Sequence, residues 1–205
     1  MAPRFVANQL ANPRGLGGRI VRFLMNRTNA RMNAFALDQL EVTAQDCVIE
    51  VGFGGGVALP RLLSKARFVC GVDPSPDVVA WAKERFAGSI SRSVAEFRLG
   101  MVETLPATQG EFDKALSVNT VYFWTSLEAG AREIARVLSP GGRIVLGFVP
   151  KSRMDRMNMP ADIFTPREPD ELLAALQLAG FSNAELRRPS GGQEWLVATG
   201  LRGAA

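Results

Sequence analysis

An acid and three alternating glycines follow one another at the end of an apolar run. The stretch VIEVGFGGG, at residues 48–56, places Glu50, Gly52, Gly54 and Gly56 in the pattern acid-x-G-x-G-x-G. Because glycine adopts backbone conformations that other residues avoid, this spacing predicts a sharp turn that lets a ligand lie directly against the backbone. An apolar run that ends this way is typical of a binding site for a nucleotide-like ligand.

Two other glycine fingerprints do not fit this stretch. The dinucleotide pattern G-x-G-x-x-G, started at Gly52, needs a third glycine at the position of Val57. The phosphate-binding P-loop needs a Gly-Lys-Ser/Thr step, and no lysine lies in the run. The turn therefore gives no indication of a pyrophosphate.

A second acid strengthens the prediction of a ligand site. Asp73 ends the next apolar run, RFVCGVD, 21 residues after Gly52 and just before Pro74. A carboxylate at this place can accept hydrogen bonds from both hydroxyls of a ribose. The alternative is an exposed acid that only begins a turn, and it would have to coincide with this spacing.

The chain of 205 residues contains no histidine. This absence excludes a Ser-His-Asp triad, a histidine general base and histidine-ligated zinc, and we expect no metal site. Cys47 and Cys70 lie in apolar runs and are interpreted as reduced, buried thiols.

The sequence shows neither the h-region of a signal peptide nor an apolar run long enough to span a membrane, so we expect a cytoplasmic protein. The formal net charge is +4, and its local source is a group of arginines near the start of the chain. Such a group could attract nucleic acid or an anionic membrane surface, but a solvated helix face is the commoner explanation. The composition leaves the oligomeric state open.

Strand-like and helical patterns alternate from residue 46 onward, which predicts a doubly wound α/β fold with a mostly parallel, seven-stranded sheet. The predicted strands are at residues 47–51, 67–73, 96–102, 112–119, 143–149, 183–188 and 193–200. Helices are predicted between most of them. Ligands of such sheets bind at the carboxyl ends of the strands, which is where the glycine run lies.

Two segments fall outside this alternation. Residues 1–45 carry helical apolar stripes and are predicted to form a helical N-terminal cap on a domain at residues 46–205. Residues 150–169 are rich in methionine and proline and lack a clear period, which favours a lid-like loop or, equally, a surface excursion.

In combination, these motifs resemble those of the class I S-adenosylmethionine-dependent methyltransferases, over about residues 45–200. The matching stretches are VIEVGFGGG, GVDPSPDVV, GMVETLP, FDKALSVNTVYFW and ARVLSPGGRIVLGF. The chain looks most like the small-molecule branch of the family, in which a helical N-terminal piece covers the pocket. The resemblance implies a Rossmann-like fold and S-adenosylmethionine as the cofactor.

The resemblance also implies a role for individual residues. Glu50 would face the sugar–methionine side of the cofactor, and the three glycines would approach the cofactor backbone. Asp73, followed by Pro74, would bind the ribose hydroxyls. The Val102 amide would face the adenine ring, and Asn119 would line the methionine end. Many relatives carry an aspartate where this chain has Met101, so recognition of the adenine would rest on the Val102 backbone and apolar packing.

Methyl transfer from a sulfonium is an in-line displacement, and alignment supplies much of its acceleration. A chain without histidine is compatible with this reaction, and the expected acceptor is a small molecule with a nucleophilic N, O, S or C atom. The catalytic residues stay unknown; Tyr122 and Trp124 are the candidates, as aromatic residues that would shape the acceptor site, and the sequence identifies no acid or base. The alternatives are a methyltransferase acting on RNA, DNA or lipid, of which nucleic acid is not favoured, and a non-catalytic cofactor-binding protein.

Overall fold

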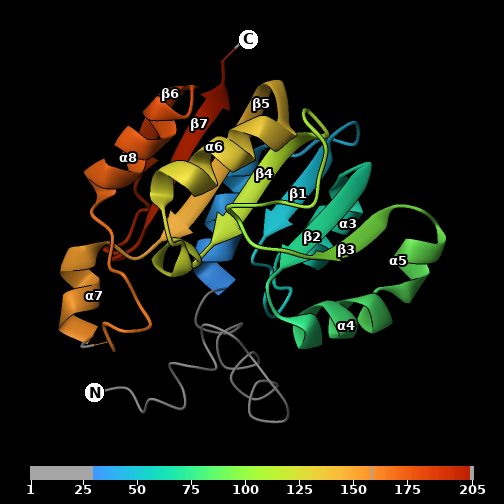
Figure 1. Cartoon of the computed structure of the whole chain (residues 1–205), viewed down its shortest axis with the longest axis horizontal. Coiled ribbons are helices and arrows are strands. Elements are labelled where there is room, and N and C mark those ends of the chain that lie inside the picture. The colour runs from blue at the N-terminus through green and yellow to red at the C-terminus, as the bar shows by residue number, and fades with distance from the viewer. Residues whose placement is uncertain (1–29, 158, 204–205) are drawn as a thin grey trace.

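A computed structural model describes residues 30–157 and 159–203 of the chain. Its centre is one seven-stranded sheet in the order β3-β2-β1-β4-β5-β7-β6 (Figure 1). The strands are β1 (Cys47–Val51), β2 (Phe68–Asp73), β3 (Ala95–Leu99), β4 (Phe112–Val118), β5 (Leu138–Phe148), β6 (Phe181–Arg187) and β7 (Leu196–Arg202).

The first five strands of the sheet run parallel, and β7 pairs antiparallel with both β5 and β6. After β1 the chain builds β2 and β3 on one side and then β4 and β5 on the other. The strand order therefore reverses between β1 and β4. This arrangement confirms the predicted mostly parallel, seven-stranded α/β fold.

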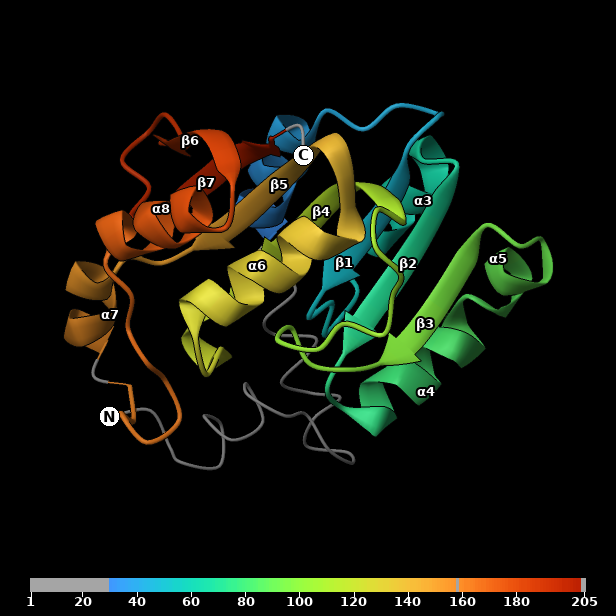
Figure 2. The ribbon, with the colours of Figure 1, turned by 45° about the horizontal axis from the view of Figure 1, so that its top comes forward.

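Helices cover both faces of the sheet (Figures 1 and 2). The helices after β1 are α3 (Leu59–Lys65), α4 (Pro76–Arg85), α5 (Ala87–Ser91), α6 (Leu127–Val137), α7 (Lys151–Met157) and α8 (Pro169–Leu178), with a short 3₁₀ turn η1 (Val121–Phe123). In Figure 1, α6 and α8 lie in front of the sheet, and the blue helix at residues 30–40 lies behind it. Each face has its own apolar core.

The start of α4 follows from its sequence. Ser75 is the N-cap residue, and its hydroxyl accepts a hydrogen bond from the backbone N–H of Val78. Pro76 occupies the first turn. Proline has no backbone N–H, and this costs nothing there because N–H groups of the first turn make no hydrogen bond within the helix. The cap fixes the point at which the chain leaves the carboxyl end of β2.

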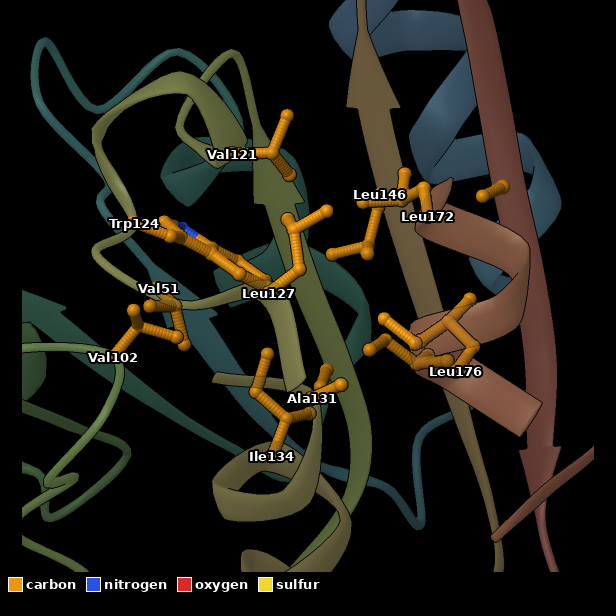
Figure 3. Close-up of a cluster of buried hydrophobic side chains, with 14 of the residues drawn as sticks. Val51, Val102, Val121, Trp124, Leu127, Ala131, Ile134, Leu146, Leu172 and Leu176 are labelled. Atoms are coloured by element: carbon orange, nitrogen blue, oxygen red, sulfur yellow. The ribbon is translucent and has the colours of Figure 1, made fainter. Parts of the chain in front are cut away.

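The front core joins α6 to α8 over the sheet (Figure 3). Leu127, Ala131 and Ile134 recur at helical spacing on α6 and are buried, as are Leu172 and Leu176 on α8. The apolar stripe of α6 in the sequence therefore becomes its contact with the sheet and with α8.

The described part of the predicted N-terminal cap is the helix at residues 30–40, and residues 1–29 lie outside the described residues. Ala36 and Leu40 of this helix are buried in the apolar core on the rear face of the sheet. Met32 is also buried and lies so close over Gly147 that a Cβ there would come within 3.2 Å of the methionine sulfur. These helical turns thus pack against the sheet as part of the core.

Two boundaries differ from the sequence expectations. The strand predicted from residue 143 begins directly after α6, at Leu138, because Gly142 lets the chain pass close to β4. A Cβ at Gly142 would lie 2.8 Å from the carbonyl oxygen of Ser139 and 3.0 Å from that of Asp113. The segment expected to be irregular contains α7, on which Lys151 and Asp155 pair at 2.8 Å one helical turn apart.

Candidate functional site

The carboxyl ends of β1, β2, β3 and β4 meet at one edge of the sheet, since these strands are parallel neighbours. The reversal of strand order between β1 and β4 separates the connections that leave these strands. In open α/β sheets the ligand crevice lies at such a reversal. The predicted cofactor residues all come from this edge.

The glycine turn after β1 has the backbone that its sequence predicts. Gly52, Gly54 and Gly56 have φ angles of +72°, +47° and +67°, in the left-handed region that favours glycine. A Cβ on Gly52 would come within 2.5 Å of the Thr120 side chain. A Cβ on Gly54 would meet no atom within 4 Å, so the space above that residue is open.

Asp73 joins the glycine turn to the start of α4. The residue is 5% exposed. Oδ2 accepts a hydrogen bond from the Gly54 N–H, and Oδ1 accepts one from the Ser75 N–H, both at 3.0 Å. These bonds hold the carboxylate in place beside the glycine turn. Pro74, which follows it, is exposed.

Glu50 lies on β1, two residues before the first glycine of the turn, and the residue is 4% exposed. Its Oε2 atom is buried and has no hydrogen-bond partner. Burial, and in second place the charge of Asp73, raises the pKa of the Glu50 carboxyl to about 8. A buried carboxyl without a partner at a strand end is a candidate contact for a cationic ligand.

The segment after β3 presents one exposed and one buried residue. Met101 is 52% exposed and pairs with Thr104 in an isolated antiparallel bridge. Val102 is buried, beside Val51 and Trp124 in the front core (Figure 3). The Gly100 N–H donates to the Asp73 carbonyl at 3.2 Å, which attaches this segment to the end of β2.

Asn119 begins the loop after β4 in a strained conformation, with a φ angle of +59°. Its N–H donates to the Gly147 carbonyl at 2.8 Å. Its side-chain oxygen accepts a hydrogen bond from the Tyr122 hydroxyl at 3.2 Å. The Asn119 side chain is therefore oriented by a residue three positions along the chain.

The two aromatic candidates, Tyr122 and Trp124, are both buried, and their polar atoms bond within the protein. The Tyr122 hydroxyl also accepts a hydrogen bond from the Val149 N–H, and burial raises the pKa of this phenol. The Trp124 indole N–H donates to Thr120 Oγ1 at 3.2 Å. This geometry makes them supports of the loop after β4.

The sequence reasoning missed Glu103 and Arg167, which connect segments that are far apart in the chain. Glu103 Oε1 accepts a hydrogen bond from the Thr125 N–H at 2.7 Å and so joins the segment after β3 to the loop after β4. Arg167 donates to the carbonyls of Val121 and Trp124, at 3.3 and 2.6 Å. No local spacing signals either contact, because each ends on a backbone group.

The end of the 150–169 segment packs against the loop after β4. The Thr165 N–H donates to the Tyr122 carbonyl at 3.0 Å. The Phe164 ring is buried, and its centroid lies 4.9 Å from that of Phe123. The segment is thus joined to the loop that begins at Asn119.

The described part of the chain shows neither a cluster of metal-ligating side chains nor a membrane-spanning helix. Within residues 30–157 and 159–203, no group of three or more potential metal-ligating side chains comes together. No helix in the same part of the chain is both long and apolar enough to cross a membrane.

Residues 49–146 match the model of a methyltransferase domain family. An uncharacterized methyltransferase of Bacillus subtilis, YdaC, is 30% identical over 134 residues, which cover 64% of this chain and 72% of that protein. An uncharacterized methyltransferase of Mycobacterium tuberculosis, Rv3342, is 32% identical over 60% of this chain, and the match spans 46% of its own length.

Solved structures agree with the fold. One chain from the complex between the Haloferax volcanii Trm112 methyltransferase activator and a methyltransferase superposes with a TM-score of 0.76, at 21% identity, over 90% of this chain and 93% of its own. Geranyl diphosphate C-methyltransferase from Streptomyces coelicolor superposes with a TM-score of 0.71, at 15% identity, over 95% and 87%. With the glycine turn and Asp73 at the edge of this sheet, the chain belongs to the class I S-adenosylmethionine-dependent methyltransferases.

Proposed function

We propose that this protein binds S-adenosylmethionine at the carboxyl edge of β1, β2 and β4 and transfers its methyl group to a small-molecule acceptor. The observation that carries the proposal is the junction of the glycine turn with Asp73. The hydrogen bond from Gly54 to Asp73 sets an open stretch of backbone beside a fixed carboxylate. This combination suits a ligand that has both a ribose and a flat, extended body.

The residues at this edge fit the cofactor chemically. Glu50 has a buried oxygen without a partner, and an ammonium group is a donor of the right charge for it. The space above Gly54 would be filled by a Cβ, as expected where a ligand lies against the backbone. Asp73 presents a fixed carboxylate beside the glycine turn, and a carboxylate is the acceptor that a ribose diol requires.

Each end of the ligand would meet a different part of the site. Glu50 would hold the ammonium, and Asp73, with Pro74 beside it, would hold the ribose. The Val102 amide would face the adenine, and the exposed side chain of Met101 would lie at its edge without supplying a carboxylate. Asn119 would line the end from which the methyl group leaves.

The bound cofactor supplies a methyl group on a positively charged sulfur, which is already activated for in-line displacement. The protein then has to hold the acceptor in line and keep water out. The Asn119 side chain, fixed by Tyr122, is suited to orient an acceptor. Tyr122 itself is buried with a raised pKa, so its role in this proposal is to position Asn119.

The neighbourhood of Asn119 supports a small and largely apolar acceptor. The rings of Tyr122, Phe123 and Phe164 pack together beside it, with centroids 4.9 to 6.4 Å apart. Met159 and Ile163, from the 150–169 segment, are partly buried against the front core that contains Tyr122 and Phe164. Geranyl diphosphate C-methyltransferase, with the same fold, carries the name of a small-molecule acceptor.

The test begins with calorimetry of the full chain against S-adenosylhomocysteine and NAD. We expect one site for S-adenosylhomocysteine and no heat from NAD. Cofactor with an isotopically labelled methyl group is then incubated with three fractions of a cell extract: small molecules, nucleic acid and lipid. Label in the small-molecule fraction supports the proposal, and label confined to nucleic acid or lipid overturns its acceptor class.

Two aspartate variants keep the experiment interpretable. Asp73→Ala removes the proposed ribose contact and should abolish the labelling. Asp113→Ala is its matched control, because Asp113 also accepts a backbone N–H, that of Cys47 at 2.8 Å, but at the opposite end of the sheet. Equal loss of labelling in both variants, with both folded, would contradict the proposed site.

A further inference from the structure

Glu50 differs from the other buried polar groups of the molecule. Among the described residues, only Oε2 of Glu50 and Nε of Arg143 are buried side-chain atoms without a hydrogen-bond partner. Arg143 still pairs with Glu41 through another nitrogen, at 2.9 Å. An unpaired oxygen inside a protein costs free energy unless a ligand satisfies it.

The surroundings of Glu50 supply no positive charge. Its register neighbours on β2 and β4 are Gly71 and Leu116, which are uncharged. Asp73, at the end of β2, is the only charged residue in the described chain that acts on the pKa of Glu50, and it raises that pKa.

One acid of the helical layer behind the sheet has a cation of its own. Asp38, on the helix at residues 30–40, forms an ion pair with Arg61 of α3. A cationic ligand would supply the positive charge that Glu50 lacks among these neighbours.

We propose that Glu50 selects for a cationic ligand: it is uncharged in the free protein and gives up one proton to solvent when the ligand's ammonium group binds against it. The inference rests on the proposed function, since S-adenosylmethionine and S-adenosylhomocysteine both carry such a group. In this step only the O–H bond of the carboxyl breaks, and the proton passes to the buffer.

Glu50 is uncharged in the free protein because it is buried and because a second acid, Asp73, lies near it. Asp73 accepts hydrogen bonds from two backbone N–H groups, and its charge acts on Glu50. A second negative charge beside it, without water, is unfavourable until a cation arrives. Since the pKa of Glu50 in the free protein is about 8, the carboxyl is mostly protonated at neutral pH.

This coupling predicts how affinity depends on pH. Below the pKa of free Glu50, a proton must leave before the ammonium is held, so affinity should rise by up to about tenfold per pH unit. Above that pKa the carboxyl is already charged, and affinity should level off. A ligand without an ammonium group should show no such dependence.

The experiment is calorimetry in pairs of buffers with different ionisation enthalpies, from about pH 6 to about pH 9. The two probes are S-adenosylhomocysteine and 5′-methylthioadenosine, which shares the adenine, ribose and thioether but lacks the ammonium. We expect release of about one proton with S-adenosylhomocysteine near pH 7 and almost none near pH 9. With 5′-methylthioadenosine we expect none at any pH.

Two variants separate Glu50 from the other acids. Glu50→Gln has the shape of the uncharged acid and is expected to fold; it should release no proton and bind S-adenosylhomocysteine at least about tenfold more weakly above pH 8. Its affinity for 5′-methylthioadenosine should be unchanged. Glu185→Gln, an exposed acid on β6, should behave like the wild type.

A second measurement uses the ligand-free protein. The carboxyl carbon of Glu50, labelled with ¹³C and assigned from its absence in Glu50→Gln, should titrate near pH 8 rather than near 4.5. Titration near 4.5, S-adenosylhomocysteine binding without proton release, or equal release with 5′-methylthioadenosine each overturns the inference and leaves the proposed function standing. If neither probe binds at any pH, the proposed function itself fails.

Discussion

The Tyr122 hydroxyl donates a hydrogen bond to the side-chain oxygen of Asn119 and accepts one from the N–H of Val149. It therefore connects the loop after β4 to the end of β5. Asn119 has a left-handed backbone, which costs free energy for any residue with a Cβ. We interpret Tyr122 as a positioning residue that holds this strained asparagine at the edge of the site.

Tyr122 is the only tyrosine in the chain, so its ionisation can be followed by the ultraviolet absorbance of tyrosinate. Its pKa is raised in the folded state by burial, whereas the unfolded chain loses the proton near pH 10. The stability tied to the neutral phenol is thus fully present below about pH 10 and is lost as pH rises beyond it. We expect tyrosinate to form only together with unfolding, followed by circular dichroism.

The variant Tyr122→Phe is the control for this titration. It should remove the alkaline tyrosinate signal and lower the free energy of unfolding by about 1–3 kcal/mol, because the Val149 N–H loses its acceptor. A native-like spectrum with tyrosinate already present near pH 10 would contradict the buried position of the hydroxyl.

The substitution Asp73→Ala should weaken the binding of S-adenosylhomocysteine by roughly 2–4 kcal/mol, because two hydrogen bonds to a charged group are lost. The protein should stay folded but become less stable, since Gly54 and Ser75 each lose an acceptor. Calorimetry and thermal unfolding measure the two effects. Asp113→Ala should lose stability alone, and unchanged affinity in Asp73→Ala would reduce Asp73 to a turn residue.

Gly54 and Gly110 form a matched pair for testing the open space above the glycine turn. Both have a positive φ angle, and a Cβ on either would meet no atom within 4 Å. Gly54→Ala and Gly110→Ala should each cost about 1–2 kcal/mol of stability from backbone strain. Only Gly54→Ala should also lose cofactor affinity, measured by calorimetry. Equal affinities in the two variants would show that no ligand approaches Gly54.

Arg167→Ala should loosen both segments that the arginine joins. The loss of hydrogen bonds to the carbonyls of Val121 and Trp124 should lower stability by roughly 1.5–3 kcal/mol. Hydrogen exchange should become faster at residues 119–126 and 163–168 and stay unchanged in the glycine turn. Arg187→Ala, which removes an exposed ion pair with Glu185, should change neither. Unchanged exchange in Arg167→Ala would contradict the role of this arginine in joining the two segments.

The sequence predicted the strands and the glycine turn because both depend on local chemistry. A parallel sheet brings its carboxyl ends together, so Asp73, Val102 and Asn119 could be assigned to one edge from their positions after strands. The positive φ angles of the three glycines are likewise a local requirement. Their roles toward a cofactor stay predictions.

The contacts that the sequence did not reveal join side chains to backbone groups far along the chain. Tyr122 and Val149 are 27 residues apart, and Arg167 and Trp124 are 43 apart. A backbone N–H or carbonyl has the same chemistry at every position, so no pattern of residue types marks it as a partner. For the same reason, the sequence suggested Tyr122 as a catalytic candidate, whereas its contacts favour a supporting role.

The position of β7 in the sheet also has a consequence for the order of folding. This strand is the last of the seven along the chain, yet it lies between β5 and β6. During synthesis β6 emerges first, and its only partner in the described sheet is still missing. The edges of β5 and β6 therefore stay unpaired until residues 196–202 have been synthesised. Chaperone binding or aggregation of the nascent chain should be greatest while these edges are unpaired.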